Sequence, residues 1–569
     1  MFNPVQRMHV PVSHTEAMFK VIVLTHKRVS HLRSLLRDLE NAEYAGDQID
    51  LEIHIDRSTA IQKVIDVARS AAFSHGPKRL IIKTQSVGLA SAWFQAWDPK
   101  STLNQRSIIF EDDIILSPYW YLWVKAAWQK YSNVPGLAGI SLQRQTLIPQ
   151  IPHEHKEIVN AHAPFLYKLV GSIGFSPNSA IWEDFLQWLK AHTAADMYVP
   201  ELITSEWWRT TDKTQMWTQH FIYFCTLNNL YTLYINLPNE RTLAGHMRAK
   251  GAHFPESLGA DFQVAATVSL QFPDVLRKYG WDGKICSNTA IDHVEAELLV
   301  EQAQRIQDRV GFAYLMFINH AYINLAKSWI CNVLLVQESA LRETIIITPD
   351  YDIARQIREL NKALHVFVFE SNATEAGSFG TFSYHRTVHE RMRLQNLLIQ
   401  RGINIMIIEA DQVWLRPITK QLQPLFQRFD LLASDELHHS SPRQKYVCAG
   451  FYGISSTNRT RGFFESYFTQ HTAQINFFQT TRNISDFTND QVLLSQLLPA
   501  SGLKVKWFDK CMYSNGMWYN SSSLRDECQG QLALLHNNYI VGNLQKIERA
   551  KKWKHWFLSS SDKCMHRHQ

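Results

Sequence analysis

Apolar and polar positions alternate along the chain in a pattern that predicts two successive α/β units. In the first half, apolar and β-branched runs at Phe19 to Thr25, Ile49 to Asp56 and Arg79 to Lys83 are typical of buried strands. Leucines at helical spacing lie between the first two runs, and a second helix is expected over residues 59–73. This order of strand, helix, strand, helix, strand predicts a mostly parallel sheet covered by helices, with ligands at the carboxyl ends of the strands.

The same alternation returns in the second half. Strands are predicted at Phe312 to Ile318, Thr344 to Thr348 and Val366 to Glu370, with helices between them. A basic amphipathic helix over Tyr384 to Gln400, ended by Gly402 as a C′ glycine, leads into a further strand. The expected fold class is therefore α/β, with two mostly parallel sheets in tandem. No residue-level repeat relates the two halves, so internal duplication is not supported.

The length supports a division into domains, because 569 residues exceed the size at which a single core keeps growing. We expect an amino-terminal tail over 1–18 and a first domain over 19–255. A Glu- and Gln-rich pattern predicts a helical connecting segment over 256–308, and the second domain then runs over 309–569.

Composition and charge exclude several classes of protein. A formal net charge of +6 is too small for this length to indicate nucleic-acid binding. No signal peptide or anchor is recognised in the first 19 residues, and the most apolar long stretch, Phe312 to Val336, contains too many polar residues to span a membrane. These features predict a cytoplasmic protein, or a protein of the Golgi lumen if the chain lacks an amino-terminal anchor. In an oxidising compartment, Cys511 and Cys528 could form one disulfide.

Two predicted strands end in groups of acids, which gives the first indication of chemistry. The apolar run within Ile403 to Pro417 ends at Glu409 and Asp411, and the run within Ser107 to Leu116 is interrupted by the three acids at 111–113. Burying carboxylates is costly unless they have a partner, and paired acids at the end of a strand suggest a cation as that partner. Each half is therefore predicted to carry a metal-bearing strand end.

In the first half, Asp56 after the second strand, Gly88 before a helix and the Glu-Asp-Asp group follow one another in a specific order. This arrangement resembles the inverting GT-A glycosyltransferases over residues 19–255. The resemblance implies that Asp56 contacts the nucleobase and ribose side, that Asp113 takes the divalent cation and that Asp112 faces the ribose. Taken alone, Asp-Asp is equally well read as a polar turn after a strand.

Two other features of the first half bear on catalysis. An inverting transferase needs a carboxylate base, and Glu206, which precedes two tryptophans, is the candidate; a capping or surface acid is the alternative. The stretch Leu243 to Phe254 contains His246 and further basic residues between glycines, which favours a flexible loop over phosphates. A solvated basic loop is the other interpretation.

The second half carries a more specific set of motifs between Gly311 and Trp556, and it resembles the nucleotide-diphospho-sugar transferase family. That family comprises retaining GT-A enzymes, among them plant cell-wall xylosyl- and arabinosyltransferases and related galactosyltransferases. The motifs are Glu409-Ala410-Asp411, Cys448-Ala449-Gly450-Phe451, Asn489-Asp490-Gln491, His536-Asn537-Asn538 and Lys546.

The resemblance implies a role for each of these motifs. Asp411 and His536 would ligate Mn²⁺ or Mg²⁺, and Lys546 would hold the diphosphate as a point charge. Glu409 and Asn538 would lie on the nucleotide side. The family usually has Asp at the position of Glu409, so the longer side chain is a departure that bears on the metal or ribose contact.

Asp490 would lie near the sugar, where it would orient the sugar or stabilise an oxocarbenium-like centre. Outside the family context, Asp490 would be read as a helix N-cap and His536 as an ordinary polar-site histidine.

Together these features predict a metal-dependent glycosyltransferase that moves sugars from nucleotide-sugar donors, UDP-linked, to a glycan or glycoprotein acceptor. The expected form is bifunctional, with an inverting first domain and a retaining second domain. One alternative is a single active carboxyl-terminal transferase with the first domain as a non-catalytic acceptor-binding module. Another is a nucleotide-sugar hydrolase or a nucleotidyltransferase, and the lack of a Gly-rich nucleotidyltransferase loop near the amino terminus weighs against the latter.

Overall fold

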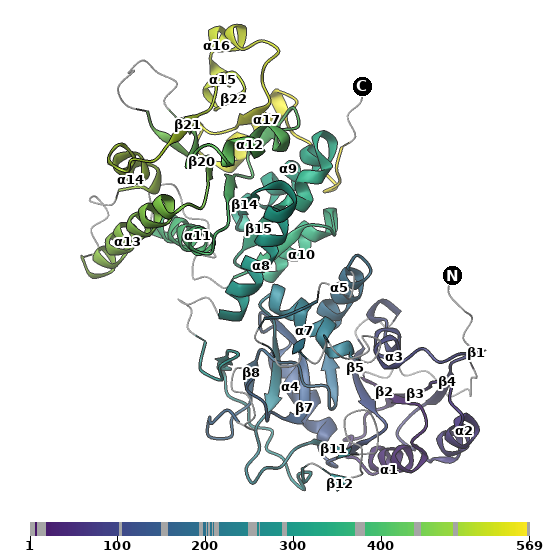
Figure 1. Ribbon diagram of the computed structural model, residues 1–569. Helices are drawn as coiled ribbons and strands as arrows, with labels where there is room; N and C mark the ends of the chain where they lie inside the picture. The colour runs from purple at the N-terminus through teal and green to yellow at the C-terminus, as the bar shows by residue number, and fades with distance from the viewer. Residues whose placement is uncertain are drawn as a thin grey trace. The chain divides into compact units, whose positions relative to one another are not determined.

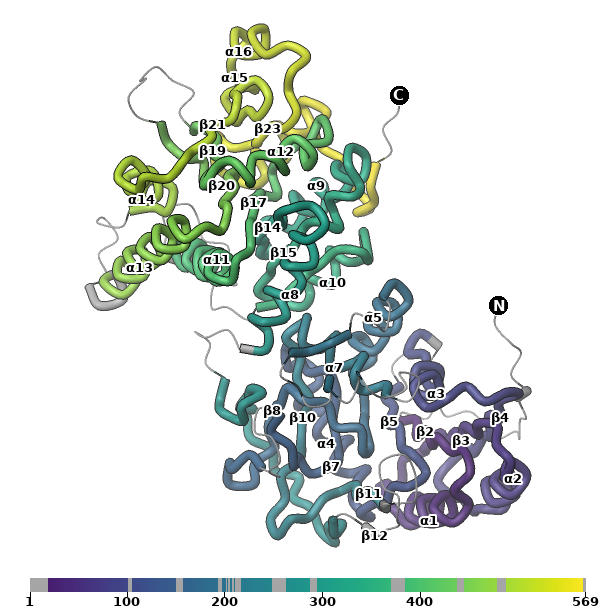
Figure 2. The backbone as a smooth tube through the Cα atoms, viewed as in Figure 1, coloured from purple at the N-terminus to yellow at the C-terminus, as the bar shows by residue number. Residues whose placement is uncertain are grey.

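The computed structural model divides the chain into two compact units, Met1–Val294 and Glu295–Gln569 (Figure 1). Each unit is built around a mixed, largely parallel sheet with helices on it, which confirms the expected α/β class. The tube in Figure 2 runs from purple to teal through the first unit and from teal to yellow through the second. The structure describes residues 6–565 except for 8–18, 102–104, 150–156, 193–196, 201, 203–204, 207–208, 210–215, 249–258, 261, 287–292, 370–381, 437–444 and 482–487.

The main sheet of the first unit has the strand order β1-β4-β3-β2-β5-β9-β7-β10-β8-β13, and a small sheet has the order β12-β11-β6. Strands β4, β3, β2 and β5 are mutually parallel and come from the predicted alternation. Every residue of β2 is buried, since helices cover both of its faces. The described strands are β1 (Gln6–Arg7), β2 (Phe19–Thr25), β3 (Ile49–Ile55), β4 (Lys78–Ile82), β5 (Arg106–Glu111), β6 (Ile114–Leu116), β7 (Leu137–Arg144), β8 (Phe165–Tyr167), β9 (Phe175–Pro177), β10 (Tyr231–Ile235), β11 (Ala244–Arg248), β12 (Gly259–Ala260) and β13 (Lys278–Tyr279); the helices are α1 (Val29–Glu40), α2 (Ile61–Ser70), α3 (Leu89–Ala96), α4 (Trp120–Tyr131), α5 (Ser179–Leu189) and α7 (Trp217–Leu227).

The main sheet of the second unit has the order β16-β15-β14-β17-β20-β19-β21, and a small sheet has the order β18-β23-β22. Strands β16, β15, β14 and β17 are again mutually parallel. Helices α11 and α13 lie side by side in Figures 1 and 2. The strands are β14 (Ala313–Phe317), β15 (Thr344–Thr348), β16 (His365–Val368), β17 (Ile405–Ile408), β18 (Gln412–Trp414), β19 (Leu431–Asp435), β20 (Val447–Ile454), β21 (Val505–Trp507), β22 (Tyr513–Ser514) and β23 (Leu534–His536); the helices are α8 (His293–Val310), α9 (Ile323–Val336), α10 (Tyr351–Leu360), α11 (Phe382–Gln400), α12 (Thr419–Phe426), α13 (Asn458–Thr481), α14 (Asp490–Leu497), α15 (Met517–Asn520), α16 (Ser522–Glu527) and α17 (Asn543–Lys552).

Both units place their acids in the same way. In the first unit, β5 pairs with β2 and ends at the acids. In the second unit, β17 pairs with β14 and ends at the acids in the same way. A short strand then follows, β6 or β18, and it pairs antiparallel with a strand from much later in the sequence. The later strands are β11 and β23, and each brings one histidine toward the acids.

Among the described residues of the segment 256–308, which was expected to be helical, helix is found from α8 onward. Its earlier described part contains β12 and β13, and β13 pairs with β8 in the sheet of the first unit. Pro273, Gly280 and Gly283 disfavour a helix in this part. The Glu- and Gln-rich helical pattern is concentrated in α8. Within the described residues, no helix is both long and apolar enough to cross a membrane.

The second unit contains two disulfides. Cys511 and Cys528 are bonded, which confirms the pairing expected from the sequence. A second disulfide joins Cys331 in α9 to Cys564, across 233 positions of the sequence. This long-range bond had no signal in the spacing of the cysteines, because no short motif links the two positions.

Candidate active site

The acids of the second unit are placed by a strand, a turn and a second strand. Buried β17 delivers the chain to Glu409, and β18 begins directly after Asp411. In the antiparallel pairing of β18 with β23, Gln412 lies opposite His536. The amide of Asn537 also donates to the backbone oxygen of Asp411, at 3.1 Å. These backbone contacts bring His536 to the acids although more than a hundred residues separate them in sequence.

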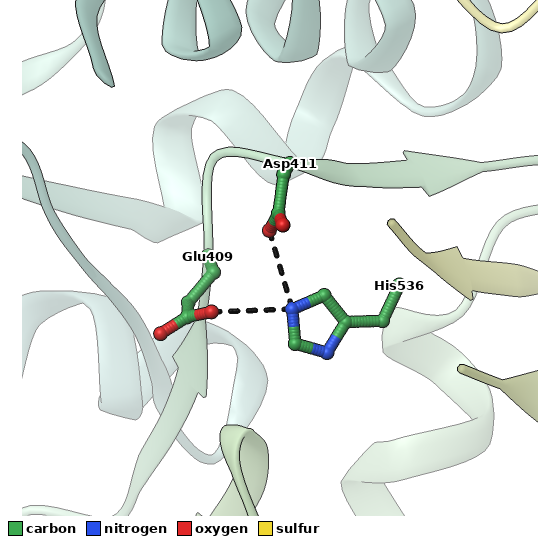
Figure 3. A group of neighbouring side chains, drawn as sticks. All are labelled: Glu409, Asp411 and His536. Atoms are coloured by element: carbon green, nitrogen blue, oxygen red, sulfur yellow. Dashed lines mark hydrogen bonds and ion pairs between the residues drawn. The ribbon is translucent and has the colours of Figure 1, made fainter. Parts of the chain in front are cut away.

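The side chains of Glu409, Asp411 and His536 converge on one point (Figure 3). His536 Nε2 lies 3.1 Å from Glu409 Oε2 and 3.2 Å from Asp411 Oδ1. A ring nitrogen carries at most one proton, so it cannot satisfy both carboxylate oxygens by donating hydrogen bonds. Since Asp411 and His536 are buried, this arrangement fits a cation held by two carboxylate oxygens and a neutral imidazole.

Two basic side chains hold the outer oxygens of the same carboxylates. Lys546 Nζ, from α17, lies 2.6 Å from Asp411 Oδ2, and Arg391, from α11, donates to Glu409 Oε1 at 3.1 Å. Burial opposes ionisation of Asp411, but Lys546 and His536 more than offset it and leave the pKa of Asp411 well below its usual range. Both acids are therefore ionised at neutral pH and keep their inner oxygens directed at His536.

The orientation of His536 is set by close packing. Its Nδ1 lies 3.4 Å from the buried thiol Sγ of Cys448. A Cβ at Gly450 would lie 2.5 Å from His536 Cε1 and 2.6 Å from Glu409 Oε2, so no larger residue fits there without a shift. Burial lowers the pKa of His536, but the carboxylate of Asp411 and the neighbouring Cys448 raise it well above the usual value. A bound cation would displace this proton.

Asp490 is joined to this group through Arg391. The guanidinium of Arg391 contacts Asp490 Oδ2 as well as Glu409, and the side chains of Arg391 and Asp490 are 11% and 4% exposed. The helix N-cap is Asn489, whose side chain accepts from the amides of Gln491 and 492. The interpretation of Asp490 as an N-cap is therefore wrong. Its carboxylate contacts the guanidinium of Arg391 instead.

The structure also brings Lys546 into the site but gives Asn538 other partners. The Asn538 side chain donates to Glu436 Oε1 at 2.9 Å and accepts from the amide of Gly516 at 2.7 Å. Its backbone oxygen accepts from Arg549. Within the described residues, Asn538 thus ties the loop after β23 to neighbouring segments.

Arg391 is the site residue that the sequence did not single out. The basic amphipathic helix over 384–400 was expected, yet helical periodicity does not say which of its basic residues faces the acids. The signal present in the sequence was an arginine on the helix that leads directly into the acid-bearing strand.

In the first unit, Asp112 and Asp113 are buried at the end of β5, as expected. His246 Nε2 lies 3.3 Å from Asp113 Oδ2, because β11 pairs with β6. The residues 244–248 therefore form a strand, which corrects the expectation of a loop for that part of 243–254; positions 249–254 lie outside the described residues. Arg28 contacts both aspartates, at 2.9 Å and 2.7 Å.

The other acids considered in the first unit, Glu111, Asp56 and Glu206, each contact a different set of residues. Burial, together with the charge of Asp113, raises the pKa of Glu111 to about 7, and Trp93 Nε1 donates to Glu111 at 3.1 Å. Asp56 accepts from the amide of Val87 at 3.0 Å and so ties two loops together. The Glu206 carboxylate is 53% exposed and contacts Tyr198 at 2.5 Å and Arg209 at 3.5 Å. Among its described contacts, none is with the acids at 111–113.

Comparison with known families agrees with the geometry of the second unit. Residues 339–550 match the nucleotide-diphospho-sugar transferase family, so the second unit contains a domain of that family. Residues 30–136 match the family described as the SPBC1E8.03c C-terminal domain. The expected resemblance is thus confirmed for the second half. For the first half, these findings support an α/β sheet and this second family, and the inverting GT-A assignment stays a prediction.

Among curated proteins, the chain is 21% identical over 263 residues to UDP-D-xylose:L-fucose alpha-1,3-D-xylosyltransferase 3 of Arabidopsis thaliana. That alignment covers 44% of this chain and 65% of the relative. The chain is also 22% identical over 209 residues to UDP-galactose:fucoside alpha-3-galactosyltransferase of Dictyostelium discoideum, covering 33% of this chain and 30% of the relative.

Among solved structures, the chain aligns with the galactosyltransferase LgtC at 11% identity and a TM-score of 0.30, covering 42% of this chain and 96% of that chain. It aligns with mouse xyloside xylosyltransferase 1 at 13% identity and a TM-score of 0.29, covering 40% of this chain and 98% of that chain.

Proposed function

We propose that the second unit transfers a sugar from a UDP-linked donor to a glycan or glycoprotein acceptor. The observation that carries this proposal is the convergence of Glu409, Asp411 and His536 on one point inside a nucleotide-diphospho-sugar transferase domain. The names of the similar xylosyl- and galactosyltransferases support a UDP-linked donor.

In this proposal Glu409, Asp411 and His536 hold Mn²⁺ or Mg²⁺. When bound, a divalent cation neutralises the charge that develops on a leaving diphosphate. Lys546, whose ammonium lies 2.6 Å from Asp411 Oδ2, adds a fixed positive charge beside the same position. Glu409 replaces the Asp usual in the family, and its longer side chain is accommodated because Gly450 leaves room next to its Oε2.

Asp490 is the proposed catalytic carboxylate near the sugar. The Arg391 guanidinium contacts both Asp490 and Glu409 and so fixes the position of one carboxylate relative to the other. A carboxylate held in this way orients the sugar or stabilises positive charge at its reacting carbon. Transfer with retention of configuration is the outcome proposed for this unit.

For the first unit we propose a role in binding a nucleotide or a glycan, with Asp56 and Asp112 on the nucleotide side. The position of Glu206 favours the single-transferase alternative over the bifunctional one. Its carboxylate is more than half exposed and contacts Tyr198 and Arg209, and none of its described contacts is with the acids at 111–113.

The disulfides support an oxidising compartment, such as the Golgi lumen, over the cytoplasm. Structural disulfides form and persist in oxidising environments and are rare in cytosolic proteins. Both Cys331–Cys564 and Cys511–Cys528 lie in the unit that holds the proposed transferase site.

The test is a panel of UDP- and GDP-sugars with Mn²⁺, in which release of nucleoside diphosphate is measured with and without glycan acceptors. Asp411→Asn is expected to lower turnover by at least about 100-fold, because the cation loses a charged ligand. If Asp113→Asn lowers turnover of a different donor, both units are transferases. If only Asp411→Asn has an effect, the first unit is a binding module. Release that does not depend on an acceptor indicates a hydrolase, and turnover unaffected by either substitution contradicts the proposal.

A further inference from the structure

One nitrogen of Arg28 lies between the two aspartates of the first unit. Its Nη1 is 2.9 Å from Asp112 Oδ1 and 2.7 Å from Asp113 Oδ2. A divalent cation shared by these oxygens would have to lie within about 2.0–2.6 Å of each. The guanidinium nitrogen already holds the space between them, so the cation and Arg28 cannot both be bound there.

The remaining contacts of these aspartates are also taken up. Asp112 Oδ2 accepts from the Thr25 hydroxyl at 2.7 Å and from the amide of His26 at 3.4 Å. Asp113 Oδ2 lies near His246 as well as Arg28. Asp112 and Asp113 are 4% and 6% exposed, and Arg28 is 32% exposed. The described contacts of the two carboxylates are thus made to groups of the protein, with Arg28 shared between them.

The backbone holds Arg28 in this position. It is the residue immediately before α1, and its carbonyl accepts from the amide of Leu32 in the first turn of that helix. The preceding strand β2 ends at Thr25, which bonds to Asp112. The guanidinium therefore reaches the aspartates from an ordered backbone position.

The second unit has the opposite arrangement. There, Lys546 and Arg391 contact the outer oxygens of the carboxylates, and the inner oxygens face the ring nitrogen of His536. No Lys or Arg contact among those the structure describes falls on the inner oxygens of Glu409 and Asp411. In the first unit, the acids at the strand end therefore contact a cationic side chain, Arg28. In the second unit, the acids and His536 leave their inner atoms directed at a point where a metal ion could bind.

We propose that Arg28 is the resident cation of the first unit, so that this unit binds its ligand without a divalent metal. Among the residues that the structure describes, one divalent-cation site then remains, at Asp411. This assignment reverses the expectation that Asp113 is a metal ligand. It rests on the proposed function only for the second unit, because the contacts of Arg28 are independent of what the second unit does.

The test is the stoichiometry of Mn²⁺ bound to the full-length, metal-stripped protein, measured by electron paramagnetic resonance of free Mn²⁺. The wild type is expected to bind one ion, Asp113→Asn still one, and Asp411→Asn none. Arg28→Gln is expected to gain a second ion, and the double substitution with Asp113→Asn is expected to lose that ion again. Lys27→Gln, which removes the neighbouring exposed cation, is the matched control and is expected to bind one ion.

The outcomes separate this proposal from the proposed function. Two ions on the wild type, of which Asp113→Asn removes one, would overturn the role of Arg28. A folded Arg28→Gln chain without a second ion would also overturn it, with folding checked by circular dichroism. If the wild type binds no ion that depends on Asp411, the proposed function of the second unit is contradicted. The role of Arg28 is still tested in that case, by the ions bound to Arg28→Gln and to its double variant with Asp113→Asn.

Discussion

Lys546 in α17 and Asp411 just before β18 form a close ion pair, with Nζ and Oδ2 2.6 Å apart. The oxygen that Lys546 contacts is the one directed away from His536. The pair therefore supplies positive charge without filling the point at which Glu409, Asp411 and His536 converge. Burial lowers the pKa of Lys546, but the carboxylate of Asp411 raises it overall, so the ammonium stays charged at neutral pH.

Replacing Lys546 by Gln should lower kcat/KM for the donor by about 100-fold, because a preorganised charge beside the leaving diphosphate is removed. The measurement is steady-state turnover of the UDP-sugar found active in the panel. Lys552→Gln is the control, since this exposed lysine lies in the same helix and its loss changes the net charge equally. Equal effects of the two substitutions would show that only long-range charge matters.

Gly450→Ala should weaken Mn²⁺ binding by about 10–100-fold, the effect typical of disturbed contacts around metal ligands. The added methyl group would lie 2.5 Å from the His536 ring and would push it from Glu409. The measurement is a Mn²⁺ titration of the full chain. Gly462→Ala is the matched control because nothing lies within 4 Å of its Cβ position in α13. It should leave binding unchanged and stabilise the helix by about 0.5–1 kcal/mol.

Arg391→Met should destabilise the second unit by about 3–5 kcal/mol, because it leaves a buried carboxylate without its cation. The side chain of Asp490 is only 4% exposed and contacts Arg391. Adding Asp490→Asn should restore part of the stability, measured by urea unfolding, but none of the donor turnover. Recovery of turnover in the double variant would show that Arg391 and Asp490 serve structure alone.

Cys331→Ser should lower the free energy of unfolding of the second unit by about 2–5 kcal/mol, because the disulfide constrains a very long loop in the unfolded chain. The bonded cysteines are 233 positions apart. Urea unfolding under non-reducing conditions is the measurement, and Cys286→Ser, at a cysteine outside both disulfides, is the control. Unchanged midpoints in Cys331→Ser would contradict a stabilising bond.

The stability of the second unit should fall as the pH decreases from about 6.5 toward 3. Burial, with the nearby His389, His385 and Arg391, lowers the pKa of His471 to about 3, and the His471 and His389 Nδ1 atoms are 3.1 Å apart. Between these pH values the unfolded chain binds a proton at His471 that the folded chain does not. The contribution of His471 to the free energy of unfolding is therefore fully present above the pKa of this histidine in the unfolded chain and is lost as the pH falls below it. The contribution is about 1.4 kcal/mol per pH unit.

The measurement for this prediction is urea unfolding at several pH values. His471→Gln should reduce the dependence of the unfolding free energy on pH between pH 6 and about 4. Parallel slopes for the wild type and His471→Gln would rule out this histidine as the source.

Much of the fold follows from local patterns in the sequence. The strands that end in acids, β5 and β17, were predicted from apolar runs that stop at carboxylates. Helix α11 was predicted from periodicity and from Gly402, at φ 86°, just beyond its end. The strands β18 and β23 carry no such signal, because each has only three residues and is defined by its pairing with the other. The acids could thus be found from sequence, and the histidine only through resemblance.

The site was harder to predict in the first unit. Asp112, Asp113 and His246 do lie together, but Arg28 also contacts both aspartates, and the metal role expected for Asp113 stays a prediction. Arg28 was visible in the sequence as one of three basic residues after the first strand. Which of the three would turn back to the acids depends on the start of α1, and local composition does not encode that direction.

The pairing of β18 with β23 also has a consequence for biosynthesis. Ribosomes deliver the chain from its amino terminus, so Asp411 emerges well before His536 and Lys546. The first unit can complete its sheet while synthesis continues, whereas the carboxylates of the second unit must wait for the last part of the chain before their partners arrive. A nascent chain that stalls before β23 would leave Asp411 without His536 and Lys546, and the proposed catalytic centre is among the last parts of the protein to form.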